Sequence, residues 1–239
     1  KMIPLESVMS KVWNKKIFEH IQKDVDKASR DLAEERGACP DAADYGIKER
    51  FSNKTAIAPT ASISIICGGT SPGVEPIAAN SFTHKTLSGS FNVRNRYLEK
   101  VLEKHNKNDD ETWSTITTNQ GSVYHLDFLT QQEKDVFKTA FELDQKWIVE
   151  LGADRTPHIS QAQSINIFIP ADIHKKELHQ IHFQAWKKGL KSLYYCRSKS
   201  IQRAENVNDA KLTDVTANVY KSKNQQNEEQ EYEECLSCQ

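Results

Sequence analysis

Two short runs rich in β-branched and aromatic residues flank one amphipathic segment toward the end of this 239-residue chain. The first run, SINIFIP, ends at Pro170, and the second, LKSLYYCR, covers residues 190–197. Between them, apolar residues recur at helical spacing from Ile173 to Ala185, and Gly189 closes the pattern. Strand, helix and strand in this order predict two parallel strands joined by a right-handed crossover. The predicted fold class is therefore α/β.

Helical periodicity also predicts two longer helices. One covers residues 5–35, with at most one break, and the glycine and proline of ERGACP end it. The other opens with a capping box formed by Thr130 and Glu133 and runs to about Leu151. Between these helices, KTAIAPTASISIICGGTSPGVEP (residues 54–76) predicts a short strand, a turn, a short apolar helix and a loop rich in glycine and proline.

The composition changes after Arg197, where Lys, Asn, Gln, Glu, Ser and Asp dominate. Such a segment buries too little apolar surface to offset its ordering entropy. We therefore predict two parts, with residues 1–197 folded and residues 198–239 forming a flexible, disordered tail. The tail ends in ECLSCQ, which carries Cys235 and Cys238 as a CxxC pair. A flexible chain of this length has a root-mean-square reach of roughly 35 Å.

The charge is almost balanced, with 32 basic and 33 acidic residues, so neither a nucleic-acid partner nor a membrane partner is expected. No apolar run approaches the roughly 18 residues that span a bilayer, and the N-terminus has no secretory pattern. Five cysteines, mostly far apart, are not typical of a secreted disulfide framework. We therefore expect a soluble, cytoplasmic protein. Because the first residue is Lys1, we also expect a fragment or a processed product.

The stretch APTASIS, residues 58–64, places Thr60, Ser62 and Ser64 around a predicted helix start. Exposed N–H groups, the helix dipole and short hydroxyls at such a position can bind an anion. The alternative is an ordinary N-cap, which is the simpler interpretation of this stretch alone. The loop that follows contains neither GxGxxG nor GK[ST], so both common nucleotide fingerprints are absent from it.

Tyr194 and Tyr195 are adjacent near a predicted strand end. Neighbours in a regular strand point to opposite faces, so the simpler interpretation is one ring in the core and one at an interface. The alternative is a pair of phenols that passes on an oxidising equivalent, because a phenol can lose an electron and a proton together.

A metal site is not predicted. His174, His179 and His182 do not share one helical face, and a single CxxC pair falls short of the four ligands of a structural zinc site. The remaining cysteines are interpreted as small buried residues: Cys39, Cys67 and Cys196.

The chain resembles the C-terminal part of the large, catalytic subunit of class I ribonucleoside-diphosphate reductase. Seven motifs carry the resemblance, in this order: ERGACP, APTASIS, GVEP, LSGSF, SQAQSINIFI, HFQAWKKGLKSLYYCR and ECLSCQ. The resemblance implies the C-terminal part of the ten-stranded α/β barrel of ribonucleotide reductase, followed by the tail. It also implies the reduction of ribonucleoside diphosphates to deoxyribonucleoside diphosphates by radical chemistry.

The resemblance further implies roles for individual residues. Tyr195 would receive the radical from a metal-containing small subunit, and Tyr194 would pass it to the active-site cysteine. Cys235 and Cys238 would be the shuttle dithiol, reduced in turn by thioredoxin or glutaredoxin. No cofactor is expected to bind to this segment itself. The residues implied for the substrate diphosphate are Pro59, Thr60, Ala61, Ser62 and Ile63.

The cysteines that form the thiyl radical and the active-site disulfide in that family lie earlier in the large subunit, as does its regulatory nucleotide domain. We therefore expect activity only together with the N-terminal part of the large subunit and the small subunit. This holds whether the chain is a fragment or one half of a split subunit. The alternatives are a stand-alone dithiol redox or nucleotide-binding protein without reductase chemistry, and a zinc-binding interaction module.

Overall fold

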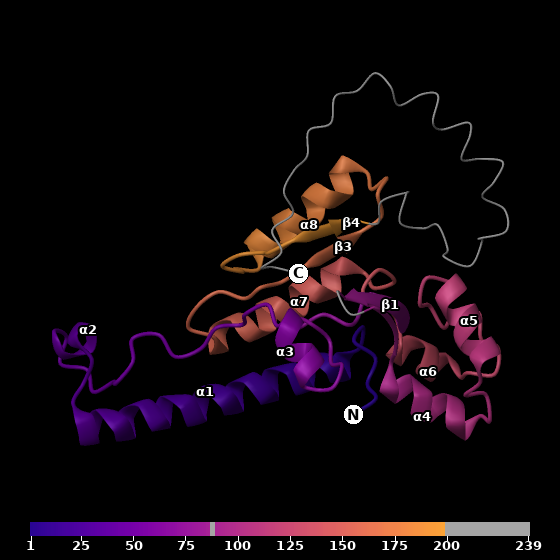
Figure 1. Cartoon of the computed structure of the whole chain (residues 1–239). Coiled ribbons are helices and arrows are strands. Elements are labelled where there is room, and N and C mark those ends of the chain that lie inside the picture. Colours follow the sequence, from indigo (N-terminus) through magenta and orange to yellow (C-terminus); the bar gives the residue numbers. More distant parts are fainter. Residues whose placement is uncertain (87–88, 199–239) are drawn as a thin grey trace, which may run out of the picture. The chain divides into compact units, whose positions relative to one another are not determined.

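The computed structural model describes residues 1–86 and 89–198 (Figure 1). The helices are α1 (Val8–Arg36), α2 (Pro40–Ala43), α3 (Ala61–Ile66), α4 (Arg96–Lys104), α5 (Asp110–Thr118), α6 (Gln131–Val136), α7 (Gln145–Arg155) and α8 (Lys175–Lys187). A 3₁₀ turn, η1 (Thr156–His158), follows α7, and the strands are β1 (Ser81–Thr86), β2 (Gly89–Arg94), β3 (Ile167–Ile169) and β4 (Cys196–Ser198). No helix within these described ranges is both long enough and apolar enough to cross a bilayer. Beyond Ser198, the predicted tail lies outside the described residues.

The predicted strand–helix–strand unit is confirmed. β3 and β4 pair in parallel, with Ile167 opposite Cys196, and α8 lies between them in the chain. The pairing starts before the strands proper, because the N–H of Tyr194 donates to the carbonyl of Ile165 at 2.7 Å. This unit therefore holds the two adjacent tyrosines directly beside β3.

One hydrophobic core lies where α7 and α8 pack together and α7 packs on β3. All residues of β3 are buried, as is usual for a strand in a parallel sheet. On the opposite edge of the segment that leads into β3, Ile57 forms a parallel bridge with Gln163, and the carbonyl of Ile57 accepts the N–H of Ser164 at 2.9 Å. The α/β class is therefore confirmed. The strands in the described part of the chain form two-stranded sheets, and no closed barrel is seen among them.

The first predicted helix is present as α1, which runs for 29 residues without a break. Ser7 caps its first turn by accepting the N–H of Ser10 at 3.1 Å, and Gly37 ends it with a φ of +82°. α1 packs against α7 (Figure 1) through polar contacts, including the ammonium of Lys11 at 3.1 Å from the carboxylate of Glu150.

The single helix predicted over 130–151 is wrong, since the chain forms α6 and α7 with a turn between them. The capping box at the start of α6 is confirmed, because Thr130 and Glu133 cap each other's backbone. The apolar residues of this stretch fill two different cores, with Phe137 in one and Leu143 in the other. A straight helix cannot reach both, and Asp144 caps a second helix start.

The other core contains buried residues of α4, α5 and the segment that leads to α6. β1 and β2 pair as an antiparallel hairpin, and α5 packs on β1. Gly121 has a φ of +81°, and a Cβ at this position would collide with the backbone of Ala79 and Asn80. The hairpin, α4 and α5 were not predicted from the sequence.

Candidate functional site

The loop Pro59–Ile63, here called the diphosphate loop after the ligand that the family resemblance implies for it, follows Ile57, which pairs with Gln163 ahead of β3. It ends in the first turn of α3, which begins at Ala61 with Thr60 as its N-cap. The first intrahelical bond runs from the N–H of Ser64 to the carbonyl of Thr60 at 2.8 Å. The preceding amides have no partner inside the helix, and no side chain of the described residues caps this turn. The loop therefore presents backbone N–H donors.

The hydroxyls of the diphosphate loop are used differently from one another. Both the N–H and the Oγ1 hydroxyl of Thr60 donate to the carbonyl of Pro72, each at 3.0 Å. The hydroxyl of Ser64, which is buried, donates to the carbonyl of Ala61 at 2.7 Å. Ser62 is exposed. Of the three predicted hydroxyls, that of Ser62 is therefore the best placed to meet a ligand from solvent.

A buried carboxylate lies on the neighbouring loop. Glu75 is only 3% exposed, and its Oε1 accepts the backbone N–H of Asn166 at 2.5 Å. Its Oε2 accepts the side-chain amide of Asn166 at 3.3 Å. Glu75 belongs to the family motif GVEP, but no role was predicted for it from the sequence. One signal could have drawn attention to Glu75: it is a charged residue within a loop rich in glycine and proline, outside any predicted helix.

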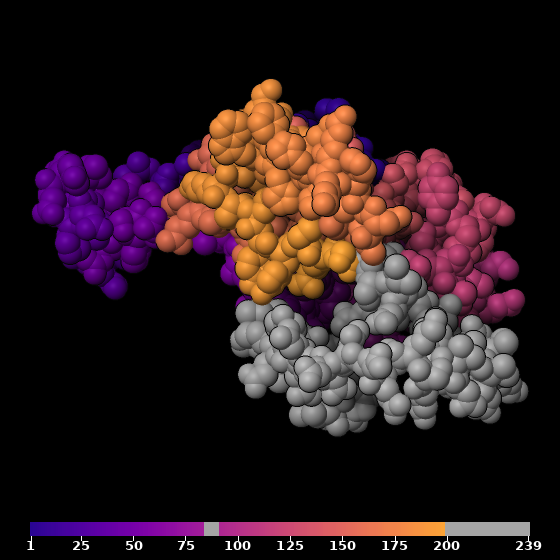
Figure 2. All heavy atoms as spheres, turned by 90° about the horizontal axis from the view of Figure 1, so that it is seen from above, coloured from indigo at the N-terminus to yellow at the C-terminus, as the bar shows by residue number. Residues whose placement is uncertain are grey.

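Tyr194 and Tyr195 are in contact, with ring centroids 4.1 Å apart and planes at 50°. The two residues are 39% and 40% exposed, so the simpler of the two interpretations, one core ring and one interface ring, is wrong. They precede β4, where the alternation of a regular strand does not hold. Figure 2 shows α8 and the segment after it at the surface. The guanidinium of Arg197 lies 5.5 Å from the centroid of the Tyr195 ring.

The interpretation of three cysteines as buried is wrong, because Cys67 and Cys196 are exposed and Cys39 is half-buried. Partial burial of the sulfur still raises the pKa of the Cys196 thiol, which lowers its thiolate fraction at neutral pH. Cys235 and Cys238 lie outside the described residues.

The histidines of α8 serve local roles. His174 caps the helix, because its Nδ1 accepts the N–H of Lys176 at 3.1 Å, and the ring of His179 stacks on Phe183. The ring of His182 lies 2.9 Å from the carbonyl of Leu178. Across the described ranges, no group of three or more His, Cys, Asp or Glu side chains is placed to hold a metal ion.

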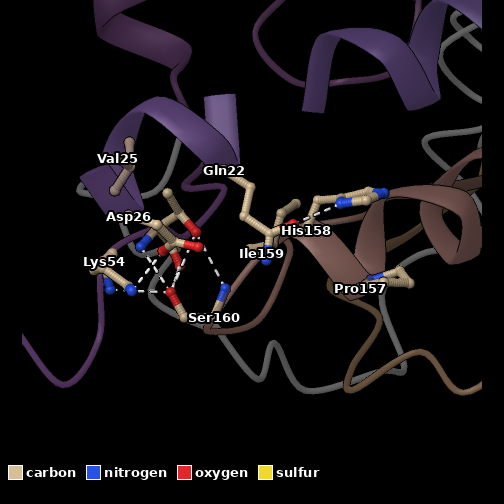
Figure 3. A pocket seen from close by; sticks show the side chains of 9 residues that line it. Gln22, Val25, Asp26, Lys54, Pro157, His158, Ile159 and Ser160 are labelled. Carbon is tan, nitrogen blue, oxygen red and sulfur yellow. Dashed lines mark hydrogen bonds and ion pairs between the residues drawn. The ribbon is translucent and has the colours of Figure 1, made fainter. Parts of the chain in front are cut away.

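A pocket of about 230 Å³ lies between α1 and η1 (Figure 3). Its polar groups pair with one another, since the ammonium of Lys54 is 2.5 Å from Asp26 and the ring of His158 is 2.7 Å from Gln22. Burial alone would lower the pKa of Lys54, but its carboxylate partners raise it. None of the predicted site residues lines this pocket.

Comparison with known proteins places these features in one family. The family model for the barrel domain of ribonucleotide reductase matches residues 41–196. The ribonucleoside-diphosphate reductase large subunit of Invertebrate iridescent virus 6 is 47% identical over 211 residues, which cover 87% of this chain and 22% of that protein. The large subunit of Invertebrate iridescent virus 3 is 43% identical over 216 residues, with 89% and 34% covered.

A solved structure gives the same result. The alpha subunit of the class Id ribonucleotide reductase of Actinobacillus ureae superposes with a TM-score of 0.75 at 36% identity, over 85% of this chain and 37% of that one. The chain thus spans between 22% and 37% of the length of these three proteins. The range 41–196 matched by the family model contains the diphosphate loop, Glu75, Asn166 and both tyrosines.

Proposed function

The chain belongs to the ribonucleotide reductase large-subunit family, and on that premise we propose that it is the C-terminal part of the catalytic barrel of a ribonucleoside-diphosphate reductase. In this role it takes part in the reduction of ribonucleoside diphosphates to deoxyribonucleoside diphosphates by radical chemistry. The observation that carries the proposal is the barrel-domain match over residues 41–196, because it contains both the diphosphate loop and the tyrosine pair.

The diphosphate loop binds the two phosphates of the substrate in this proposal. Its support is the uncapped first turn of α3, where successive N–H groups and the positive end of the helix dipole favour an anion. The hydroxyl of Ser62 adds a donor from the exposed side. Pro59 precedes the turn, and Ala61 and Ile63 contribute through their backbone amides.

The tyrosine pair relays the radical. Tyr195 receives it from a metal-containing small subunit, and Tyr194 passes it to the active-site cysteine of the assembled large subunit. The contact between the two rings supports this role, since a hop between phenols requires close approach. Their partial exposure is consistent with an entry point at a subunit surface.

Cys235 and Cys238 form the shuttle dithiol in this proposal. A disulfide forms inside the barrel at each turnover, and a bulky reductase cannot reach it there. The attacking thiolate of one cysteine forms a mixed disulfide, and the second thiol resolves it, so that the tail becomes oxidised and the barrel disulfide reduced. Thioredoxin or glutaredoxin then reduces the tail. The support is the CxxC spacing on a polar segment of the same chain.

Reconstitution tests the function. The chain is mixed with the N-terminal part of a related large subunit and a radical-bearing small subunit, and deoxyribonucleoside diphosphate is measured. We expect product from the complete mixture and none when either partner or this chain is omitted. Deoxynucleotide formation by the chain alone would contradict the proposal. A chain that reduces a model disulfide, but gives no deoxynucleotide in the complete mixture, would favour the stand-alone dithiol protein instead.

A further inference from the structure

We infer that Glu75 is a positioning residue that fixes the diphosphate loop by tying the loop Ser71–Pro76 to Asn166, directly before β3. This inference rests on the proposed function for its consequence, namely substrate affinity. The positioning role itself depends on hydrogen bonds whose loss can be measured without any substrate.

The segment that leads into β3 pairs with Ile57 along one edge. The N–H of Ser164 donates to the carbonyl of Ile57 in the usual ladder. After Ile57 the chain turns away into the diphosphate loop. The N–H groups of Asn166 and Phe168, which follow on the same edge, therefore need acceptors other than the backbone of that segment. Asn166 donates instead to Oε1 of Glu75 at 2.5 Å, and Phe168 donates to Oε1 of Gln145 at 2.8 Å. The side chains of Glu75 and Gln145 thus accept the backbone N–H groups that have no backbone acceptor on this edge.

Further contacts lead from Glu75 to the diphosphate loop. The loop Ser71–Pro76 folds around the carboxylate, since the hydroxyl of Ser71 donates to the carbonyl of Glu75 and a Cβ at Gly73 would collide with Oε2. The carbonyl of Pro72 in the same loop accepts both the N–H and the hydroxyl of Thr60 at 3.0 Å. The chain of contacts from β3 to the N-cap of α3 therefore passes through Glu75.

The side chain of Asn166 determines which substitution preserves the contact. Oδ1 of Asn166 is buried and has no hydrogen-bond partner within the described part of the chain, while its amide nitrogen donates to Glu75. In Glu75→Gln, one oxygen still accepts the backbone N–H of Asn166. A half-turn of the Asn166 amide then lets Oδ1 accept from the new amide nitrogen. Glutamine should therefore restore the tie, whereas methionine, of similar length, cannot.

Hydrogen–deuterium exchange of the full chain tests the tie directly. We expect the Thr60 amide to exchange about tenfold faster in Glu75→Met than in the wild type, because the lost bonds to a buried carboxylate free the Pro72 loop. Exchange in Glu75→Gln should stay within about threefold of the wild type. Gln145→Met is the matched control, since it removes the other side-chain acceptor of β3. It should speed exchange at Phe168 but not at Thr60.

The outcomes separate the possibilities. Wild-type exchange at Thr60 in Glu75→Met would overturn the inference, and so would equal acceleration at Thr60 in Gln145→Met, which would indicate a general weakening of β3. If circular dichroism shows Glu75→Met to be unfolded, Ser71→Ala decides the matter. We expect about threefold faster exchange at Thr60 in that variant, and no change would overturn the inference.

Calorimetric titration with ADP and with inorganic diphosphate tests the consequence. We expect Glu75→Met to weaken binding of both about tenfold and Glu75→Gln to restore it, with Gln145→Met close to the wild type. Unchanged affinity in a folded Glu75→Met would overturn the link to the substrate. If the wild type binds neither ligand, the phosphate assignment of the proposed function fails, while the exchange result still decides whether Glu75 positions the loop.

Discussion

Replacing one tyrosine of the pair by phenylalanine separates a radical relay from a structural role. Tyr194→Phe and Tyr195→Phe each keep the aromatic ring, so the contact between the rings, with centroids 4.1 Å apart, should persist. Only the hydroxyl is removed. Phenylalanine has no hydroxyl proton to release, and a relay that passes through both rings should stop at either substitution.

The size of the structural effect can be bounded. Both tyrosine residues are about 40% exposed, so water can replace any lost partner of the hydroxyl. The loss should cost no more than about 1 kcal/mol of folding free energy, or roughly 2–4 °C in melting temperature. Even if this whole amount appeared in the activation barrier, the rate would fall by less than about tenfold. A fall below the limit of detection cannot be explained in this way.

The assay is steady-state deoxynucleotide formation by the reconstituted enzyme, with melting temperature and diphosphate affinity measured in parallel. We expect both variants to fold, to bind diphosphate like the wild type and to give no turnover. Tyr124→Phe is the matched control, because Tyr124 is 58% exposed and lies outside the pair, and it should keep full activity. Activity within tenfold of the wild type in either pair variant would refute the relay.

Other changes test the remaining assignments. Ser62→Asp should abolish diphosphate binding in a titration, because its charge would face the phosphates; unchanged binding would show that the loop is misplaced. Cys235→Ser with Cys238→Ser should leave about one round of product from pre-reduced enzyme but stop turnover with thioredoxin or glutaredoxin, and continued turnover would exclude the shuttle. The hydrogen bond to Lys188 lowers the pKa of Glu150. The ionised Glu150 carboxylate therefore stabilises the fold above the ordinary glutamate pKa, and this stabilisation is lost as the pH falls through the lowered pKa. Glu150→Gln should therefore reduce the loss of stability between neutral and acidic pH in urea denaturation, and an unchanged pH dependence would contradict this.

The strand–helix–strand unit could be predicted because its signals are local and agree with one another. Periodicity, the stop at Pro170 and the β-branched runs all lie within one stretch of chain, and the structure places β3, α8 and β4 there. The helix over 130–151 failed for the opposite reason. Its apolar spacing is equally regular, but Phe137 and Leu143 belong to different cores, and periodicity does not tell which core a side chain enters.

For the candidate site, as for the fold, the sequence predicted some features and not others. The helix start beside the hydroxyl residues of APTASIS was expected, and α3 begins at Ala61. The use of the Thr60 hydroxyl was not expected, because it does not cap the helix and its acceptor is the carbonyl of Pro72 on another loop. The contact between Tyr194 and Tyr195 was missed because strand alternation was applied to residues that precede the strand. For Thr60, the sequence located the residue, while the carbonyl of Pro72, distant in the chain, decided how its hydroxyl is used.

Glu75 shows most clearly why sequence reasoning stops short of such a site. Burying a carboxylate is costly unless its oxygens are hydrogen-bonded. From the residue type alone, Glu75 would therefore be expected at the surface, whereas it is only 3% exposed. The position becomes favourable only because β3 leaves an N–H without a backbone acceptor where the diphosphate loop departs. Where the chain leaves the sheet, it forms the loop that we propose to bind the phosphates, and it leaves the N–H of Asn166 to be accepted by Glu75. Binding geometry and burial of the carboxylate are therefore two results of one feature of the sheet, and a change at either should be detectable at the other.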